Sequence, residues 1–513
     1  MLTRLKVSGF KNLVDVDVRF GPFTCIAGPN GVGKSNLFDA IRFLSDLADR
    51  PLAEAAQAVR GDENGKRLSD IRSLFWRCGD QCESTMSFDA EMIVPSSGQD
   101  DLGEDAKATT TFLQYSLILG YRKDESLASR GSIEVLEERL RYIKKGDASE
   151  RLLFDSKPCW RDSAVQGRRS GSDYISTEEL TEGRIIKLHQ DGRHGRPLSR
   201  LATNLPRTVL SATNAAENPT ALLARREMRS WRLLQLEPSA LRKPDDFSAP
   251  TKLGANGSHL AATLYRLAHQ NGDGIKDTED CSVCARVANR LAELIDDVRT
   301  VSIDRDEKRE QLTVNVTGAN KTTHAARSLS DGTLRFLALA VLEQDPEVQG
   351  VLCLEEPENG LHPAKIPAMI ELLQDIATDT NEAIGPDNPL RQVIVNTHSP
   401  AVVLQVPEDT LLVAEPRELI SSGSRFQGIR FSCLPGTWRA KKAPNEASIC
   451  RLGDLLAYLN PVLPPDNSAL KDAATVMTRE QKTDQVAHKR VVDRPDVQEY
   501  FPWFKSVSSQ PDE

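Results

Sequence analysis

The sequence lacks long apolar runs. No stretch of about 18 apolar residues occurs in the 513-residue chain, so no segment has the length that a membrane-spanning helix requires. Residues 1–13, MLTRLKVSGFKNL, contain no apolar signal core and read as a strand, so we expect no secretory signal. Together these absences predict a cytoplasmic protein with no membrane partner.

A cysteine pattern typical of disulfides is also absent. The nine cysteines are scattered, and Cys25 lies in an apolar segment that leads to a glycine-rich loop. Unpatterned thiols suit the reducing cytoplasm. Cys78-x-x-x-Cys82 and Cys281-x-x-Cys284 could together hold zinc, but the two pairs lie far apart and no histidine is well spaced to help. Free thiols are therefore the favoured interpretation.

The chain has no excess of positive charge and no long coiled coil. Its formal net charge of −9 argues against a surface that coats nucleic acid throughout. Candidate local patches are Arg225-Arg226 with Arg229, and Arg168-Arg169. A solvated helix face or loop is the favoured interpretation of each. No segment sustains three or four heptads, so no coiled-coil arm is predicted.

Length and changes of periodicity predict a chain of several parts. A chain of 513 residues is long enough for two or three structural units. Period-two patterns at the start and within 301–316 predict strand hairpins, and helical patterns include 133–142, 221–236 and 283–295. We expect an N-terminal lobe, a mixed but largely helical insertion that forms a lever or lid, a C-terminal lobe and a Pro-rich, partly disordered appendage, over residues 1–120, 121–300, 301–435 and 436–513.

A phosphate-binding loop is the strongest motif. The apolar strand 23–27 runs into Gly-Pro-Asn-Gly-Val-Gly-Lys-Ser at 28–35, which fits G-x-x-x-x-G-K-[ST] at every fixed position, and a helical pattern follows. Glycines let backbone N–H groups face phosphate oxygens, Lys34 should reach the β- and γ-phosphates, and Ser35 should ligate Mg²⁺. The predicted nucleotide contacts are Gly28, Pro29, Asn30, Gly31, Gly33, Lys34, Ser35 and Asn36.

Two adjacent carboxylates end a second apolar strand. Residues 351–356, Val-Leu-Cys-Leu-Glu-Glu, have the composition of a central strand of a parallel sheet, and ligands bind at the carboxyl ends of such strands. We expect Glu355 to hold Mg²⁺, directly or through water. Glu356 is the expected general base that orients and deprotonates the attacking water.

A histidine ends a third apolar strand. Residues 391–400 read Arg-Gln-Val-Ile-Val-Asn-Thr-His-Ser-Pro, so that the strand breaks at His398 and then at Pro400. A lone histidine is usually structural or solvated. At the carboxyl end of a core strand beside the predicted glutamate pair, His398 is better interpreted as a sensor of the γ-phosphate.

A second anion site is predicted at residues 329–333, Leu-Ser-Asp-Gly-Thr. These residues precede an apolar helical pattern, Ser330 can cap that helix, and its first-turn N–H groups attract anions. The chain already has its own phosphate-binding loop. The second site therefore makes physical sense if it serves nucleotide bound to another copy, which predicts a dimer.

Taken together, these motifs resemble the ABC-type ATPases of the RecF, SMC and OLD group and occur in that family's order. The opening GFKNL (9–13) and the run EPENGLHP (356–363) are similar to the stand-alone AAA15/AAA21 branch. The resemblance implies an α/β head, a mixed sheet with flanking helices, in which two copies sandwich two ATP molecules. It also implies that Ser330 and Gly332 contact the partner's γ-phosphate.

The sequence departs from this family at two positions and lacks the patterns of two structural features of its members, a coiled-coil arm and a Toprim domain. Asp331 stands where many members have glycine, and Glu355 replaces the usual aspartate. The absence of heptads disfavours an SMC-like arm. OLD-type nucleases carry a Toprim domain with an Asp-x-Asp pair, but no such pair follows His398, and Asp304-Arg305-Asp306 reads as a charged turn.

The resemblance leaves three functions open. The favoured hypothesis is an ATP-driven switch that acts on DNA or on a nuclease or Toprim-like partner, in repair or in anti-phage defence. A scaffold that binds ATP with little turnover is the alternative. A transporter energy module is the third, and the RecF-like opening and the large insertion count against it.

Overall fold

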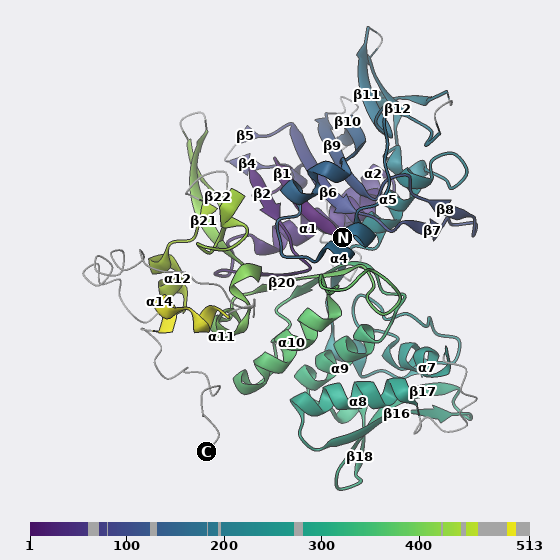
Figure 1. Ribbon diagram of the computed structural model, residues 1–513, viewed down its shortest axis with the longest axis vertical. Coiled ribbons are helices and arrows are strands. Elements are labelled where there is room, and N and C mark those ends of the chain that lie inside the picture. Colours follow the sequence, from purple (N-terminus) through teal and green to yellow (C-terminus); the bar gives the residue numbers. More distant parts are fainter. Residues whose placement is uncertain are drawn as a thin grey trace.

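The computed structural model describes residues 1–59, 71–78, 81–123, 131–181, 183–192, 196–270, 281–421, 424–442, 448–459 and 490–498. Two large sheets organise these residues (Figure 1). The first is an eight-stranded antiparallel sheet of order β13-β12-β11-β10-β9-β6-β1-β2. Its strands are β1 (Leu2–Ser8), β2 (Val16–Arg19), β6 (Thr85–Ile93), β9 (Phe112–Arg122), β10 (Ser132–Tyr142), β11 (Ile175–Leu180), β12 (Gly183–Leu188) and β13 (Leu198–Leu201).

The second sheet has six strands in the order β14-β19-β20-β3-β21-β22. The first five run parallel to their neighbours, and only β22 is antiparallel. β3 and β20 are buried along their whole length, as central parallel strands with covered faces should be. The strands are β3 (Phe23–Ala27), β14 (Arg232–Leu234), β19 (Gly350–Glu355), β20 (Arg391–Thr397), β21 (Leu411–Ser421) and β22 (Ser424–Cys433).

Helices cover this parallel sheet. α1 (Lys34–Leu47) follows β3 and packs its apolar face into one core with the eight-stranded sheet. α9 (Asp331–Glu343), α10 (Ile366–Ile376) and α11 (Pro400–Gln405) belong to a second core. α7 (Leu260–Gln270), α8 (Ser282–Leu294) and the hairpin of β16 (Val298–Asp306) and β17 (Gln311–Gly318) complete that core. The predicted 301–316 hairpin and 283–295 helix are thus confirmed.

The prediction of a largely helical insertion is wrong for its first half. Residues 133–142 form β10, which pairs antiparallel with β9, and β11 to β13 extend the same sheet. Glu, Arg and Leu in this segment have high helix propensity, but pairing with β9 buries Ile133, Val135 and Leu140 on one face of the sheet. Residues 221–236 divide into α5 (Pro219–Arg229) and β14.

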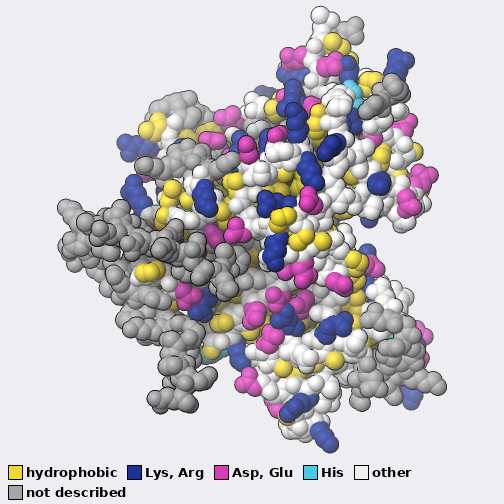
Figure 2. All heavy atoms as spheres, viewed as in Figure 1, with side chains coloured by type: hydrophobic (Ala, Val, Ile, Leu, Met, Phe, Trp, Pro, Cys, Tyr) yellow, Lys and Arg dark blue, Asp and Glu magenta, His cyan; other side chains and the backbone are white. Residues whose placement is uncertain are grey.

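The candidate basic patches are engaged within the fold. Arg225 and Arg229 both lie within ion-pair distance of Asp49 and Asp101, at 2.8 to 3.7 Å. Arg169 stacks over the Tyr174 ring, 4.0 Å from its centroid. On the face shown in Figure 2, Lys and Arg side chains are interspersed with Asp and Glu rather than gathered in one stripe.

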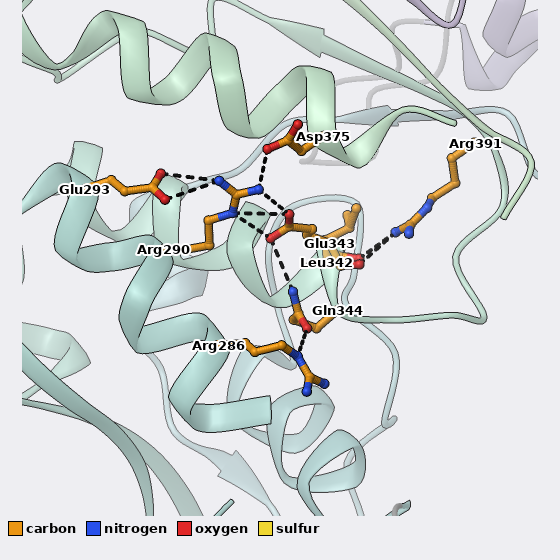
Figure 3. A network of polar contacts seen from close by, with 8 residues as sticks. All are labelled: Arg286, Arg290, Glu293, Leu342, Glu343, Gln344, Asp375 and Arg391. Carbon is orange, nitrogen blue, oxygen red and sulfur yellow. Dashed lines mark hydrogen bonds and ion pairs between the residues drawn. The ribbon is translucent and has the colours of Figure 1, made fainter. Parts of the chain in front are cut away.

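A polar network ties the helices of the second core together (Figure 3). Arg290 of α8 donates to Glu343 of α9 at 2.8 Å and forms a second ion pair with Asp375 of α10. Arg391, at the start of β20, donates to the carbonyls of Leu342 and Glu343 at 3.1 Å. The network links α8, α9 and α10 with one another and the C-terminal end of α9 with β20.

The predicted appendage, 436–513, is only partly described. α12 (Leu452–Leu459) and α14 (Pro495–Gln498) contribute Leu455, Leu459 and Val497 to the second core. The disorder predicted for the rest of this segment falls outside the described residues. In the part of the chain that the structure describes, no helix is long and apolar enough to cross a membrane.

Candidate functional site

The loop between β3 and α1 has the backbone of a phosphate cradle. Gly31 and Gly33 adopt positive φ angles of 79° and 109°, a region that favours glycine. Gly28 lies so close to β21 that a Cβ atom there would stand 2.5 Å from the Ala414 carbonyl oxygen. α1 begins at Lys34 without a side-chain cap and without an acidic residue in its first turn. Its first N–H groups are therefore available to an anion.

Lys34 is held by the loop that it follows. Its ammonium donates to the carbonyls of Gly28 at 2.7 Å and Pro29 at 3.0 Å. Burial lowers the pKa of Lys34, and the charges of Glu356, Glu355 and Glu358 partly offset that effect. Among the described residues Lys34 has no carboxylate within ion-pair distance. Its charge is thus free to meet an anionic ligand.

Asn12 supports the loop from behind, a role that sequence reasoning did not assign. Its Nδ2 donates to the Val32 carbonyl at 2.9 Å, and its Oδ1 accepts from Asn36 at 2.7 Å. A Cβ atom on Gly33 would stand 2.1 Å from Asn12 Nδ2, so only glycine fits there. Lys11, its neighbour, pairs with Asp39 at 2.7 Å. The segment before β2 therefore fixes the loop and the first turn of α1.

The two predicted carboxylates lie at the carboxyl end of β19. Glu355 Oε1 accepts from Asn396 Nδ2 at 3.3 Å, and the Glu356 N–H donates to the Asn396 carbonyl at 2.9 Å. Glu356 has φ of 47°, an uncommon backbone for a residue with a side chain, and such strain gathers at functional sites. Asn396 on β20 thus orients both glutamates.

The Glu356 carboxylate has two polar partners. Its Oε2 accepts from Asn359 Nδ2 at 2.8 Å, and its Oε1 lies 2.5 Å from Nδ1 of His398. Burial alone would raise the pKa of Glu356, but the hydrogen bonds from Asn359 and His398 and the charges of His398 and Lys34 outweigh burial. The pKa of Glu356 therefore lies below its ordinary value, and the carboxylate is ionised at neutral pH.

A cavity of about 580 Å³ separates the loop from these carboxylates. On the loop side it is lined by Asn30, Gly31, Gly33, Lys34, Ser35 and Asn36. On the opposite side it is lined by Glu355, Glu356, Asn359, Asn396, Leu234 and Arg335. Arg335, which donates to the Asn359 carbonyl at 2.5 Å, was also missed, because nothing in the α9 sequence distinguishes it.

These residues fit a nucleotide with a divalent cation. The uncapped α1 terminus and the Lys34 ammonium present positive charge from one wall, and Glu355 and Glu356 present oxygen from the other. Hydroxyl and carboxylate oxygens, such as those of Ser35 and Glu355, are the ligands that Mg²⁺ prefers. Gly28 and Pro29, two of the predicted nucleotide contacts, do not line the cavity, and their carbonyls accept from the Lys34 ammonium.

The predicted second anion site lies outside this cavity. Ser330 caps α9, and its Oγ accepts from the Thr333 N–H at 3.2 Å, as predicted. A Cβ atom on Gly332 would stand 2.5 Å from the Gly360 carbonyl, so Gly332 permits close approach of the loop that follows Glu356. Neither Ser330 nor Gly332 lines the cavity that contains Lys34.

The cysteine pairs have separate surroundings. Cys281 lies at the start of α8, where its Sγ accepts from the Cys284 N–H at 3.3 Å, and both side chains are buried in the second core. Cys78 and Cys82 lie on β4 (Arg77–Cys78) and β5 (Gln81–Cys82), a two-stranded hairpin. Cys281 thus serves as a helix cap.

A family model matches most of the chain. The AAA_21 model, described as "AAA domain, putative AbiEii toxin, Type IV TA system", covers residues 23–92 and 96–404. These ranges include the phosphate loop, α9, both glutamates and His398.

Matches to curated proteins are short. The chain is 34% identical over 90 residues to the DNA replication and repair protein RecF of Magnetococcus marinus, covering 16% of this chain and 24% of that protein. It is 51% identical over 41 residues to the OLD nuclease of Thermus scotoductus, covering 8% of each chain. The chain thus spans about a quarter or less of the length of these relatives.

Solved structures similar to the chain are SMC heads. An SMC head bound to the C-terminal winged-helix domain of ScpA has a TM-score of 0.42 and 14% identity, and the match covers 84% of this chain and 98% of that one. The SMC head domain from Thermotoga maritima has a TM-score of 0.34 and 11% identity, with coverage of 83% and 97%.

Proposed function

Because the chain belongs to the AAA_21 family of P-loop ATPases, we propose that it binds ATP in the cavity between the phosphate loop and β19 and hydrolyses it. The observation that carries this proposal is the placement of Glu356. An ionised carboxylate, oriented by Asn359 and His398, faces the same cavity as Lys34. A scaffold that only holds ATP has no need of an oriented base at this position.

Each group has a separate task in this proposal. Lys34 and the first N–H groups of α1 bind the β- and γ-phosphates, and Asn12 keeps the loop in shape. Glu356 orients the attacking water and accepts its proton. His398 holds the Glu356 carboxylate and senses the γ-phosphate.

Ser35 and Glu355 are the residues proposed to hold Mg²⁺. When bound, the ion would supply positive charge against the negative charge that develops on the phosphate oxygens. Glu355 reaches one methylene further than an aspartate would. The hydrogen bond from Asn396 Nδ2 to Glu355, at 3.3 Å, supports the longer side chain in its position.

We also propose that the catalytic unit is a dimer of heads. The α9 terminus, capped by Ser330, does not line the chain's own cavity, and we propose that it meets nucleotide bound to another copy. A second copy, related to the first by a twofold axis, would present Ser330 and Gly332 to the phosphate that Lys34 binds. The same contact repeats on the other side of the twofold axis, so the dimer contains two identical sites.

We propose that ATP hydrolysis drives a conformational switch of the heads. The switch acts on DNA or on a partner effector, such as a nuclease or a Toprim-like protein. The printed names of the short matches, a DNA replication and repair protein and a nuclease, support a role near DNA, in repair or defence. The formal net charge of −9 favours a partner protein over coating of DNA by the whole surface.

Phosphate release by wild-type protein and by Glu356→Gln tests the hydrolysis. We expect the substitution to lower the rate by at least about 100-fold, the range of a lost general base, while ATP binding persists. Lys34→Ala is the control that loses binding as well. Equal rates for wild type and Glu356→Gln would leave only the ATP-binding scaffold.

A second measurement tests whether DNA or a partner protein is the target of the switch. The ATPase rate is compared with and without duplex DNA, and with and without proteins that co-purify from native cells. A rate change with one of them identifies the class of target. A rate unchanged by all of them would contradict the switch.

A further inference from the structure

A second cavity lies at the opposite end of the parallel sheet. It has a volume of about 270 Å³ and is bounded by α5, β14 and residues 345–349 before β19. Arg232, the first residue of β14, lines it, whereas Leu234, at the other end of the strand, lines the nucleotide cavity. The two cavities share no lining residue, so the second is a separate site.

Arg232 stands in this cavity without a partner. Its side chain is half-buried, and its guanidinium makes no hydrogen bond or ion pair with any residue that the structure describes. Burial lowers the pKa of Arg232, and the more distant charge of Asp345 offsets only part of that effect. A guanidinium keeps its charge in any case, so a desolvated cation faces the cavity.

A second guanidinium lies beside the same cavity. Arg226, on the exposed face of α5, donates to the carbonyl of Gln99, which is neutral. Within the described ranges no carboxylate lies at ion-pair distance from Arg226. Neither Arg226 nor Arg232 is therefore paired with a carboxylate among the residues that the structure describes.

The carboxylates that line this cavity are already paired. Asp345 forms an ion pair with Arg266 at 2.5 Å, and Glu347 forms one with Lys252 at 3.0 Å. Glu227 accepts from the Trp231 indole at 3.0 Å and pairs with the α-amino group of Met1. These pairs leave Arg226 and Arg232 as the cations that attract a further anion.

An uncharged cavity adjoins the arginines. It has a volume of about 340 Å³ and shares Pro95, Ser97 and Gln349 with the arginine-lined cavity. Its other polar lining residues include Ser96, Ser163 and Gln166, and none of the described residues that line it is charged. A ligand with one anionic group could thus extend an uncharged polar body into this space.

We propose that the two cavities form a binding site for a small organic phosphate, with the phosphoryl group between Arg226 and Arg232 and a hydroxyl-rich body along Ser97 and Gln349. A phosphoryl group is a dianion that matches two guanidinium charges, and the arginine fork suits its oxygens. Ser230, another lining residue, donates its hydroxyl to the Glu227 carbonyl and can accept a ligand hydroxyl. The site does not depend on hydrolysis at Glu356.

Thermal stability in the presence of anions tests this site. The measurements use Lys34→Ala, so that binding at the phosphate loop is removed, at constant ionic strength and without nucleotide. The probes are ribose 5-phosphate, inorganic phosphate and, as a neutral control, ribose. Binding to the folded state raises Tm in a saturable way.

Ribose 5-phosphate is expected to raise Tm, inorganic phosphate to do so at higher concentration, and ribose to have no effect. Adding Arg232→Gln should raise the half-saturating concentration of ribose 5-phosphate at least about 10-fold, because one charge-assisted contact is lost. Arg226→Gln, on the surface of α5, should act in the same direction and keeps the test valid if Arg232→Gln impairs folding. Arg299→Gln, an exposed arginine on β16, is the matched control.

Two results would overturn the proposal. An unchanged response to ribose 5-phosphate in both Arg232→Gln and Arg226→Gln would remove the phosphoryl site. Equal half-saturating concentrations for ribose 5-phosphate and inorganic phosphate would overturn the assignment of the uncharged cavity to the ligand body.

Discussion

Oε1 of Glu356 lies 2.5 Å from Nδ1 of His398. The two residues follow one another across the sheet, because Glu356 comes directly after β19 and His398 directly after its parallel neighbour β20. Parallel pairing of these strands thus brings together a carboxylate and an imidazole that are 42 residues apart.

His398 is predicted to control both the rate of hydrolysis and its pH dependence. His398→Gln should lower kcat by about 10- to 100-fold, with a change of less than about threefold in ATP affinity. Because the histidine helps to lower the pKa of Glu356, its removal should move the acid limb of the pH–rate profile to higher pH.

Asn359→Ala removes the other hydrogen bond to Glu356 and serves as the parallel variant. Its acid limb should move in the same direction. An acid limb that stays in place in both variants would show that Glu356 is not the group that titrates.

Asn12 is predicted to determine nucleotide affinity without touching the nucleotide. Asn12→Ala loses the hydrogen bonds to Val32 and Asn36, so the phosphate loop should loosen and the Kd for ATP should rise by about 10-fold. Isothermal titration measures the Kd, and Asn320→Ala, at an exposed turn after β17, is the control. An unchanged Kd in Asn12→Ala would contradict this supporting role.

Glu138 is predicted to make stability depend on pH. Burial raises the pKa of Glu138 to about 7, although the N–H groups of Leu210 and Val209 and the Tyr115 hydroxyl partly oppose this effect. The folded state therefore holds its proton more tightly than the unfolded state, whose pKa is near 4.5. The stabilisation is full below pH 4.5 and is lost as the pH rises to about 7.

Thermal unfolding between pH 4.5 and 8.5 measures this effect. Tm of the wild type should fall over that window more steeply than Tm of Glu138→Gln, which cannot titrate. The variant should also be less stable at low pH, because its amide N–H₂ faces a backbone donor. Parallel pH profiles for the two proteins would contradict the prediction.

Local patterns were enough to predict that the phosphate-loop sequence, the two glutamates and His398 follow apolar strands, and that Ser330 caps a helix. Each of these lies at the junction of an apolar strand or helix with a short polar motif, so neighbouring residues define its place. The structure brings Lys34, Glu355 and Glu356 to one cavity, because β3, β19 and β20 run in the same direction.

The supporting residues could not be predicted in this way. Asn12, Arg335 and Asn396 act through contacts between elements that are distant in sequence, and none belongs to a pattern with chemical meaning of its own. The charged residues of β10 predict a helix, whereas antiparallel pairing with β9 makes this segment a strand.

Mixing two inactive variants tests the central claim, that ATP is hydrolysed at a site shared by two copies. Lys34→Ala removes the phosphate loop's cation and Ser330→Arg blocks the α9 terminus, so each alone should lose hydrolysis while circular dichroism reports a wild-type fold. In an equimolar mixture half of the dimers are mixed, and each contains one intact site, so about a quarter of the wild-type rate should return. A mixture as inactive as its components, although heterodimers form, would contradict the shared site.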